Sequence, residues 1–598
     1  MALRTGARPA FGRSADFNPS LAPSFNFTGA CPEIDCLRGR LPPVVIADAE
    51  QRATRVGVGA DRVLIAAGKV DEETYLRAHA DSLGVPFDSL DGVARARCPL
   101  DDDRLIEAAA GGILPLTVGD ELHFVIAPQR LAARGIGELI DDKPDIARRI
   151  RFTTAERLNG FVLRHAAAAL AARAGKELKE RWPALSAAPP RWRGNLLPLG
   201  IVGAVALAAL ILAPVQTALA SELLLAVIFL AWLGLRLIGL VIDPRPPDPP
   251  LSLRDDELPV YTIISALYRE AASVDGLLSA IERLDYPHEK LDVKLVIEAD
   301  DADTAAAIAA RKSRIPVEVI TAPDCEPRTK PKALNVALPF ARGNFTVIYD
   351  AEDRPEPRQL RRALQSFAAA GDDLACVQAC LSIDNTADSW LARLFTAEYA
   401  GQFDIFLPGI AALRLPMPLG GSSNHFRTAT LRHVGGWDAY NVTEDADLGV
   451  RLARFGYRVG TIDSTTYEEA PARLGLWLRQ RTRWFKGWMR PVKGSLFSSL
   501  INNLDKLTHA SVRLSQRHRN NCVTRVSRTG THRPLYARWQ TSVGPYGMSA
   551  KCQKRTNAAQ QTDAMGDYRA AARERLRCHP CPNVQHTGRF SPEKYRRR

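Results

Sequence analysis

Carboxylates follow two apolar segments that have the composition of buried strands. Residues 298–303 (EADDAD) come directly after the run 293–297, and residues 350–353 (DAED) end the run 344–349. Parallel strands bring their carboxyl ends to one edge of a sheet, where ligands bind. Carboxylate oxygens suit a hard cation such as Mg²⁺ or Mn²⁺, which would neutralise a diphosphate. Either cluster alone fits a solvated loop equally well, but together they predict a site made by Glu298, Asp300, Asp350, Glu352 and Asp353.

A basic segment, residues 328–335 (RTKPKALN), lies between the two acidic clusters. It includes Lys332 directly before an expected helix. The N-terminus of a helix already favours anions, so a lysine there suits contact with a phosphate. Taken alone, the segment is also an ordinary helix start.

Two further segments carry polar groups suited to a sugar hydroxyl. Residues 420–427 (GGSSNHFR) form a Gly/Ser-rich turn that a substrate can approach closely. Thr443 is expected to cap a helix whose first turn contains Glu444 and Asp445. A structural cap explains that pattern without chemistry, yet a carboxylate there could also serve as a general base.

Residues 476–488 (LWLRQRTRWFKGW) place Trp477, Trp484 and Trp488 seven and four residues apart. This spacing puts the three rings on one face of a helix, with Arg and Lys around them. The pattern predicts an amphipathic helix whose aromatic rings lie at the depth of lipid headgroups.

The elements that must position these residues alternate between strand and helix. Apolar strands are expected at residues 260–267, 293–297 and 344–349, with a helix at 273–284. This alternation predicts a mostly parallel, doubly wound α/β sheet.

These segments, in this order, resemble the membrane-associated inverting enzymes of glycosyltransferase family 2, the cellulose-synthase-like group. The resemblance covers about residues 257–495. It rests on an ordered set of motifs: Leu284–Pro287, the acids Glu298 and Asp300, Lys332, the DAED segment, Thr443-Glu444-Asp445, and the Q-x-x-R-W motif Gln480–Trp484.

The resemblance implies a GT-A-like, Rossmann-like fold and a hexosyltransferase that uses a nucleotide-sugar donor and a glycan acceptor. Its residue roles follow by motif. The donor would be bound by Glu298, Asp300, Lys332 and Asp350, and Mg²⁺ or Mn²⁺ by Asp350 with Glu352 or Asp353. Asp445 would be the catalytic base. The acceptor and pyrophosphate would contact Asn424, Glu444, Gln480, Arg483 and Trp484.

Two long apolar segments precede this domain. Residues 195–221 contain no charge, and residues 223–242 contain only Arg236, while ~20 apolar residues suffice to cross a bilayer. Pro214 and Glu222 are expected to mark the turn between two spans, and basic residues flank both ends. The pattern predicts a transmembrane hairpin at 195–242 in the inner cell membrane, with the catalytic domain cytoplasmic. Two buried helices of a soluble domain are the alternative.

Residues 45–160 are expected to form a small α+β domain, with a helix capped by Asp71 and a strand at 121–127. The segments 68–73 and 83–87 resemble the N-terminal domain of type II secretion ATPases, some of which bind cyclic di-GMP. Residues 1–44 are predicted to be disordered, and 161–194 to form a helix and linker. This domain supports an alternative function, a signalling or assembly component of a secretion or adsorption apparatus whose transferase domain is degenerate.

The net charge of +13 would suggest nucleic-acid binding if it were spread over the chain. Residues 505–598 alone contain 20 Lys/Arg and 5 Asp/Glu, which leaves the preceding 504 residues at −2. The body therefore offers no basic groove for a nucleic acid. The tail is predicted to be disordered and without membrane spans, and the alternative is an aberrant segment from a shifted reading frame over a lost membrane region.

Overall fold

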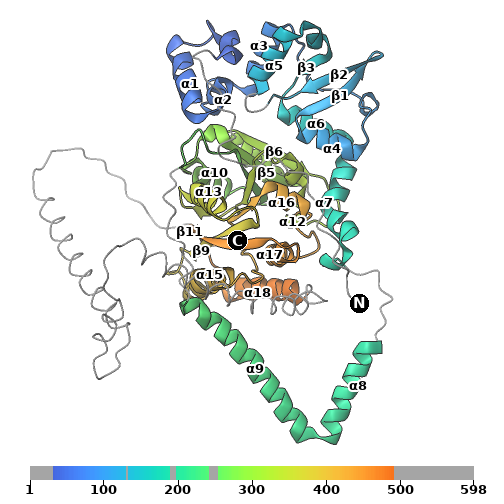
Figure 1. The fold of residues 1–598 in the computed structure, drawn as a ribbon, viewed down its shortest axis with the longest axis vertical. Coiled ribbons are helices and arrows are strands. Elements are labelled where there is room, and N and C mark those ends of the chain that lie inside the picture. Colours follow the sequence, from blue (N-terminus) through green and yellow to red (C-terminus); the bar gives the residue numbers. More distant parts are fainter. Residues whose placement is uncertain (1–30, 129–131, 189–196, 242–252, 490–598) are drawn as a thin grey trace, which may run out of the picture. The chain divides into compact units, whose positions relative to one another are not determined.

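The computed structural model describes residues 31–128, 132–188, 197–241 and 253–489 (Figure 1). The predicted disordered tail at 505–598 lies outside these residues. Within them the chain forms an N-terminal α+β region, two apolar helices and a larger α/β domain.

The α/β domain is built on one eight-stranded sheet of order β6-β5-β4-β7-β10-β9-β11-β8. Its first four strands are parallel, β10 is antiparallel to both of its neighbours, and β11 is parallel to β9. The predicted doubly wound parallel sheet is therefore confirmed for one half and wrong for the other, which is mixed. The strands are β4 (Tyr261–Leu267), β5 (Leu291–Glu298), β6 (Val317–Ala322), β7 (Phe345–Ile348), β8 (Arg354–Pro355), β9 (Leu374–Ile383), β10 (Asn424–Arg427) and β11 (Arg458–Glu468).

Helices cover both faces of this sheet, which explains why its central strands are continuous apolar runs. All eight residues of β5 and all four of β7 are buried. Ile263 and Ile264, adjacent on β4, belong to two different hydrophobic clusters, one on each face. One face is covered by α10 (Val274–Glu282), α11 (Ala302–Ala310) and α13 (Gln359–Ala369), and the other by α12 (Lys330–Ala337), α16 (Thr428–His433) and α17 (Glu444–Arg454).

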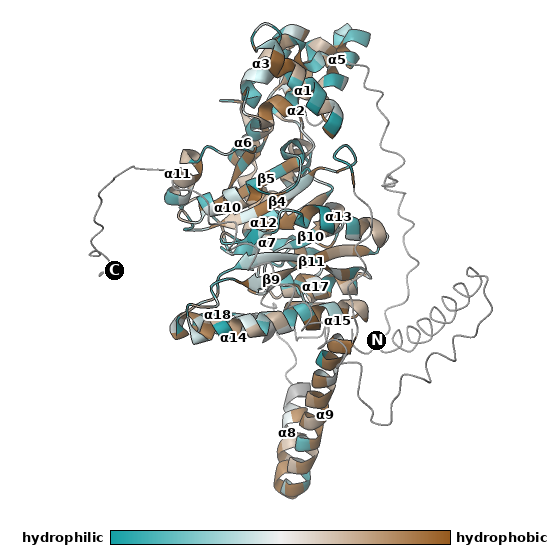
Figure 2. Cartoon of the chain, turned by 90° about the vertical axis from the view of Figure 1, so that its left-hand side faces the viewer, coloured by the Kyte–Doolittle hydropathy of each residue, from teal (hydrophilic) through white to brown (hydrophobic). Residues whose placement is uncertain are grey.

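A helical layer follows the sheet on the side of β9 and β11. It consists of α14 (Trp390–Ala400), a π-helical turn (Gly401–Phe406), α15 (Leu407–Ala412) and α18 (Leu474–Met489). Figure 2 shows α14 and α18 running alongside each other beneath the sheet.

The N-terminal region contains a three-stranded sheet of order β1-β2-β3, formed by β1 (Ile113–Val118), β2 (Glu121–Ile126) and β3 (Ile150–Phe152). Asp71 caps α3 as predicted, since the Thr74 amide donates to its carboxylate at 2.8 Å. The helices of the region are α1 (Pro43–Val56), α2 (Ala60–Ala66), α3 (Glu72–Leu83), α4 (Asp102–Ala110), α5 (Ala132–Asp142), α6 (Ala155–His165) and α7 (Ala167–Arg181).

Order in this region begins before residue 45. Residues Pro32–Leu37 form a 3₁₀ helix, and Ile34 and Leu37 are buried in the same cluster as Tyr75 of α3. The predicted disorder is therefore wrong for residues 31–44, because their apolar side chains complete the core over α2 and α3.

The predicted helix and linker at 161–194 is docked on the α/β domain for most of its length. Leu170 and Ala174 of α7 share a hydrophobic cluster with Leu334 of α12. The Asn335 side-chain amide donates to the carbonyl oxygens of Ala174 at 2.9 Å and Trp437 at 2.7 Å. The N-terminal region is thus held to the helix that begins at Lys330.

Two apolar helices, α8 (Leu197–Leu212) and α9 (Pro214–Val241), lie between the two regions in sequence (Figure 2). The break falls at Ala213 and Pro214, where proline suits the first turn of a helix. Glu222 lies inside α9, so its predicted place in the turn is wrong. Within the described part of the chain, α9 alone is both long and apolar enough to cross a membrane, and α8 is a shorter apolar helix.

Candidate active site

A group of carboxylates, here called the acid cluster, lies beyond the carboxyl ends of β7 and β11 and at the start of α17. Its members are Asp350, Glu352, Glu444, Asp445 and Glu468. The ammonium of Lys330 lies 2.5 Å from Asp350 Oδ1 and donates to the Gly421 carbonyl oxygen at 3.2 Å. The structure therefore brings the 350–353 and 443–445 segments together.

The electrostatics of the cluster follow from burial of many like charges. Burial, reinforced by Glu444, raises the pKa of Asp445 well above its usual value, while Lys330 acts in the opposite direction. Burial and Asp350 likewise raise the pKa of Glu352. Burial lowers the pKa of Lys330, but the carboxylates of Asp350, Asp445 and Glu444 outweigh it and place that pKa well above the usual value. Lys330 is thus a permanent cation that partly neutralises the cluster.

Asp353 lies behind the cluster rather than in it. Its side chain is fully buried, and its carboxylate accepts the backbone N–H of Asp350 at 2.7 Å. Burial and the neighbouring Asp350 raise the pKa of Asp353 well above its usual value. This carboxyl group therefore shapes the turn that presents Asp350 and Glu352.

Lys332 and Lys330 have opposite surroundings. Lys332 is fully buried, donates to the Pro323 and Cys325 carbonyl oxygens at 2.8 and 3.1 Å, and lies 3.6 Å from Glu298. It braces the loop before α12, whereas Lys330 reaches the acid cluster. Side chains two positions apart on a helix point about 200° apart, so only one of the two lysines can face the cleft. The sequence pattern does not show which one, and Lys330 was missed.

The predicted nucleotide acids lie at the end of β5. Asp300 pairs with Arg328 at 2.5 Å, and Glu298 lies 4.0 Å from the same guanidinium. Burial raises the pKa of Glu298, and Lys332 acts against that rise. Both acids are therefore held by cations on the loop that precedes α12.

Asn424 and His425 lie on β10 and are fully buried. The Asn424 side-chain amide donates to the Gly420 carbonyl oxygen at 2.8 Å, and its Oδ1 has no hydrogen-bond partner within the described residues. His425 Nδ1 lies 2.8 Å from the Tyr261 hydroxyl, and burial lowers the pKa of His425 to about 3. His425 is therefore a neutral core residue, while Asn424 shapes the Gly-rich turn beside the cluster.

The Q-x-x-R-W motif lies on α18, and its aromatic residues face inward. Trp477 and Trp484 pack against a core cluster that includes Phe395 of α14. The predicted placement of these two rings among lipid headgroups is therefore wrong, because α14 supplies an apolar surface for them. The Trp488 side chain lies outside the described residues. On its flanks α18 exposes apolar side chains, namely Leu474, Leu476, Leu478 and Phe485.

Arg481 is a second residue that the sequence analysis missed. Its guanidinium pairs with Glu398 of α14 at 2.7 Å and lies 4.7 Å from the centres of the Phe395 and Trp484 rings. Burial raises the pKa of Glu444, and Lys330 and, to a smaller extent, Arg483 act against that rise. Arg481 therefore joins α18 to α14, whereas Arg483 lies near Glu444 of the acid cluster. The buried Gln480 Oε1 has no hydrogen-bond partner in the part of the chain described.

Thr443 precedes α17 but does not cap it through its side chain. Its hydroxyl donates to Asn441 Oδ1 at 3.3 Å. The predicted Thr cap is wrong, because this hydroxyl stabilises the turn before the helix.

The donor set suits a divalent cation that also binds the substrate. Among the described residues no group of three or more His, Cys, Asp or Glu side chains is arranged to hold a metal. Mg²⁺ sites often use one or two carboxylates and complete the shell with phosphate and water. Asp350 and Glu352 fit that pattern, with a diphosphate supplying further oxygens.

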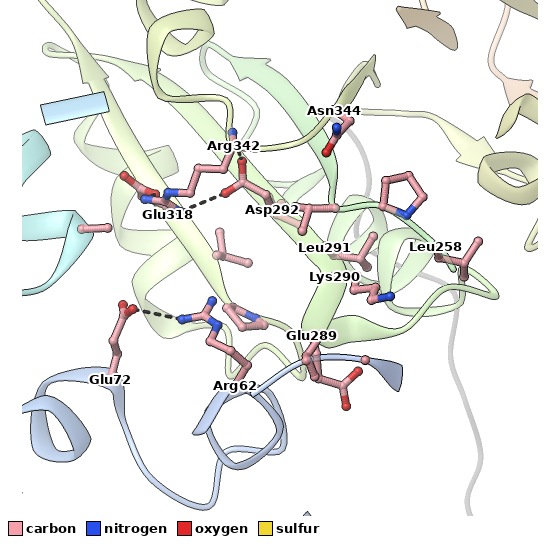
Figure 3. Close-up of a pocket in the computed structure, with 18 of the residues that line it drawn as sticks. Arg62, Glu72, Leu258, Glu289, Lys290, Leu291, Asp292, Glu318, Arg342 and Asn344 are labelled. Atoms are coloured by element: carbon pink, nitrogen blue, oxygen red, sulfur yellow. Dashed lines mark hydrogen bonds and ion pairs between the residues drawn. The ribbon is translucent and has the colours of Figure 1, made fainter. Parts of the chain in front are cut away.

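A cavity of about 470 Å³ lies on the opposite edge of the sheet, between the N-terminal region and the amino ends of β4, β5 and β6 (Figure 3). Several of its charged lining residues pair with one another. Arg62 lies 3.1 Å from Glu72, and Arg342 lies 2.9 Å from Asp292 and 2.7 Å from Glu318. The cavity is therefore part of the contact between the two regions and separate from the acid cluster.

The mixed sheet and the carboxylates at its strand ends are those of a GT-A-like glycosyltransferase domain. Residues 259–487 match the family model described as "Glycosyltransferase like family 2". The chain therefore contains a glycosyltransferase family 2 domain over this range.

Relatives support this assignment. The chain is 26% identical over 246 residues to a probable glycosyltransferase YdaM of Bacillus subtilis, covering 39% of this chain and 56% of the relative. It is 27% identical over 237 residues to a beta-monoglucosyldiacylglycerol synthase of Synechocystis, covering 38% and 48%. The chain thus spans about half the length of these relatives. A solved mannosyltransferase of Pyrobaculum calidifontis, in complex with GDP-Man and Mn²⁺, aligns at 23% identity with a TM-score of 0.34, covering 44% of this chain and 71% of that one.

Proposed function

We propose that this protein is a membrane-associated inverting glycosyltransferase that moves a sugar from a nucleotide-sugar donor to a glycan acceptor. Exopolysaccharide or envelope glycan synthesis is the process we assign to it. The observation that carries the proposal is the convergence of Asp350, Glu444 and Asp445 on one site within the family 2 domain, with Lys330 among them.

Donor recognition is assigned to the ends of β5 and β7. Asp300 and Glu298 would contact the base or ribose of the nucleotide, and Asp350 with Glu352 would hold the cation and diphosphate. We choose Glu352 over Asp353 as the second ligand because the Asp353 carboxylate is buried and accepts the Asp350 amide. When bound, Mg²⁺ or Mn²⁺ supplies positive charge that stabilises the departing diphosphate.

Asp445 is assigned as the general base. The acceptor hydroxyl attacks the anomeric carbon from the face opposite the nucleotide, and Asp445 takes its proton as the bond to the diphosphate oxygen breaks. A base works best when its pKa lies near the working pH, and the raised pKa of Asp445 supports this role. Direct displacement converts an α-linked donor into a β-glycoside.

The acceptor side is assigned to α18 and the turn before β10. Arg483 would stabilise charge on the diphosphate, while Gln480, Trp484, Glu444 and Asn424 would line the acceptor path. Support comes from the position of Arg483 near Glu444 and from the unpaired oxygens of Gln480 and Asn424.

Membrane attachment is proposed from two apolar surfaces. Leu223, Leu224 and Leu230 of α9 are all more than 60% exposed, which is costly in water and favourable in lipid. The exposed apolar side chains of α18 would rest on the same bilayer. We retain the two-span hairpin and the cytoplasmic orientation in the inner membrane as part of this proposal.

Regulation by cyclic di-GMP rests on the resemblance of residues 68–87. The alternative, a signalling component with a degenerate transferase domain, rests on the same resemblance and on the unusual composition of residues 505–598. They remain hypotheses beside the main proposal. Titration of the full chain with cyclic di-GMP distinguishes them, because a regulated transferase would bind it and change its rate of turnover.

A panel assay tests the main proposal. Membranes containing the full chain are given UDP- and GDP-sugars with Mn²⁺ or Mg²⁺, and release of UDP or GDP is measured. We expect metal-dependent release from one donor, with a β-linked product. Absence of turnover from the whole panel, with folded protein in the membrane, would contradict the proposal.

A further inference from the structure

Lys330 occupies a position from which a bound donor and its cation would have to displace it. Its ammonium is 2.5 Å from Asp350 Oδ1, an oxygen of the carboxylate that we assign to the cation and diphosphate. The side chains of Lys330 and Asp350 are each about 30% exposed, so the pair can be reached by solvent and substrate. A divalent ion on Asp350 would lie beside the ammonium if the lysine stayed where it is.

Two cations at one carboxylate repel each other, and the repulsion is strengthened because the neighbouring Glu444 and Asp445 are buried and the local dielectric is therefore lower. Without a donor, a divalent ion must therefore either displace the ammonium or bind against its charge. A bound diphosphate changes this balance because its oxygens can accept both the metal and the ammonium.

Resting on the proposed function, we propose that Lys330 is an internal counter-ion that the divalent cation replaces when the donor binds. The ammonium moves from Asp350 to the donor diphosphate, and Asp350 becomes free to hold the cation. Metal and nucleotide then bind cooperatively, and each increases the affinity of the other by the same factor.

The surroundings of Lys330 fit such a movement. Besides its contact with Asp350, the Lys330 ammonium donates to the carbonyl oxygen of Gly421, at 3.2 Å, in the Gly-rich turn. Lys332, two residues further on, is fully buried and held by two carbonyl oxygens, so it has the contacts of a fixed structural lysine. The contrast indicates that Lys330 can exchange partners without disturbing the core of α12.

The test measures Mn²⁺ binding to the full chain in detergent, from the electron paramagnetic resonance signal of free Mn²⁺, without nucleotide and with UDP or GDP. For the unaltered protein we expect one nucleotide to tighten Mn²⁺ binding at least about tenfold, within the usual range of coupling between sites. Lys330→Gln should bind Mn²⁺ about tenfold more tightly without nucleotide and should lose most of the coupling. Lys330→Arg keeps the positive charge and should therefore retain the coupling between Mn²⁺ and nucleotide. Lys312→Gln, a control at an exposed lysine, should match the unaltered protein.

Coupling below threefold with both nucleotides in the unaltered protein would overturn the proposal, whether or not the variants fold. Unchanged coupling in folded Lys330→Gln would do the same, because the lysine would then only hold the Gly-rich turn. Sugar turnover is measured in parallel. Sugar turnover without coupling between Mn²⁺ and nucleotide would refute only the counter-ion role of Lys330. Coupling without turnover would refute the proposed transferase activity and would support the exchange of the ammonium for the cation.

Discussion

Gly487 of α18 packs directly against Thr443, the residue before the acidic first turn of α17. A β-carbon on Gly487 would lie 2.4 Å from Thr443 Oγ1 and 2.8 Å from Thr443 Cβ. The two atoms cannot approach so closely, so this glycine allows α18 to reach the turn that carries Glu444 and Asp445. The contact links the Q-x-x-R-W helix to the proposed base.

Gly487→Ala should therefore separate α18 from the 443–445 turn and lower turnover by about tenfold or more, in the range of effects of small misplacements at active sites. Gly475→Ala is the matched control on the same helix, because a β-carbon there meets nothing within 4 Å. Turnover of both variants is compared at equal folded protein. Equal activity of the two would show that the contact has no role in catalysis.

A second prediction concerns Arg481 and the docking of α18 on α14. Arg481→Lys removes the two-nitrogen contact with Glu398 and the stacking on Phe395 and Trp484. We expect looser docking of α18 on α14, seen as faster proteolysis after Arg479 or Lys486, and a lower rate with little change in donor affinity. Arg479→Lys, whose guanidinium contacts only its own helix through Gly475, should behave like the unaltered protein.

His425 predicts a pH dependence of stability. Its pKa is about 3 in the fold and near 6.5 in an unfolded chain, so its contribution to stability is complete above pH 6.5 and is lost as pH falls toward 3. The loss approaches about 1.4 kcal/mol for each pH unit below 6.5. Urea unfolding of His425→Gln between pH 7 and 5 should show a correspondingly flatter dependence.

His288→Gln is the control for that experiment, since His288 lies in a short 3₁₀ turn and is only half buried. If His425→Gln and the unaltered protein lose stability in parallel over this range, protonation of His425 does not limit acid stability.

Substitution of Asp350 should weaken donor binding in a metal-dependent way. Asp350→Asn should weaken donor binding at least about tenfold when Mn²⁺ is present and much less when it is absent, because the amide is a poorer ligand for a hard cation. Asp373→Asn removes a carboxylate that pairs with Arg458 at the amino ends of β9 and β11, on the opposite edge of the sheet, and should leave donor affinity unchanged. A loss of equal size with and without metal would assign Asp350 to the nucleotide alone.

The sequence predicts β4, β5 and β7 well, because these strands are buried on both faces and appear as largely apolar runs, two of them followed by acids. The edge strand β6 was missed, because several of its residues are exposed and the apolar signal is weaker. The sequence predicts the mixed half poorly. The four-residue strand β10 (Asn424–Arg427) is polar at several positions, since its side chains form hydrogen bonds inside the fold, to the Tyr261 hydroxyl and the Gly420 carbonyl oxygen.

The choice between neighbouring residues of one type was also beyond the sequence. Lys330 and Lys332 both precede or begin a helix, and Arg481 and Arg483 both lie in the Q-x-x-R-W motif. Which member of each pair faces the acid cluster depends on the rotation of a helix, and tertiary packing sets that rotation. The inward turn of Trp477 and Trp484 has the same origin, because only the fold shows that α14 lies beside them.

The most direct test of the central claim is the turnover of Asp445→Asn with the donor identified by the panel. Donor affinity should stay within about threefold of the unaltered protein, while turnover should fall by roughly 10²–10⁴, the usual effect of removing a positioned general base. Turnover that stays within threefold of normal, or that falls only in proportion to the folded fraction, would contradict the assignment of Asp445 as the base.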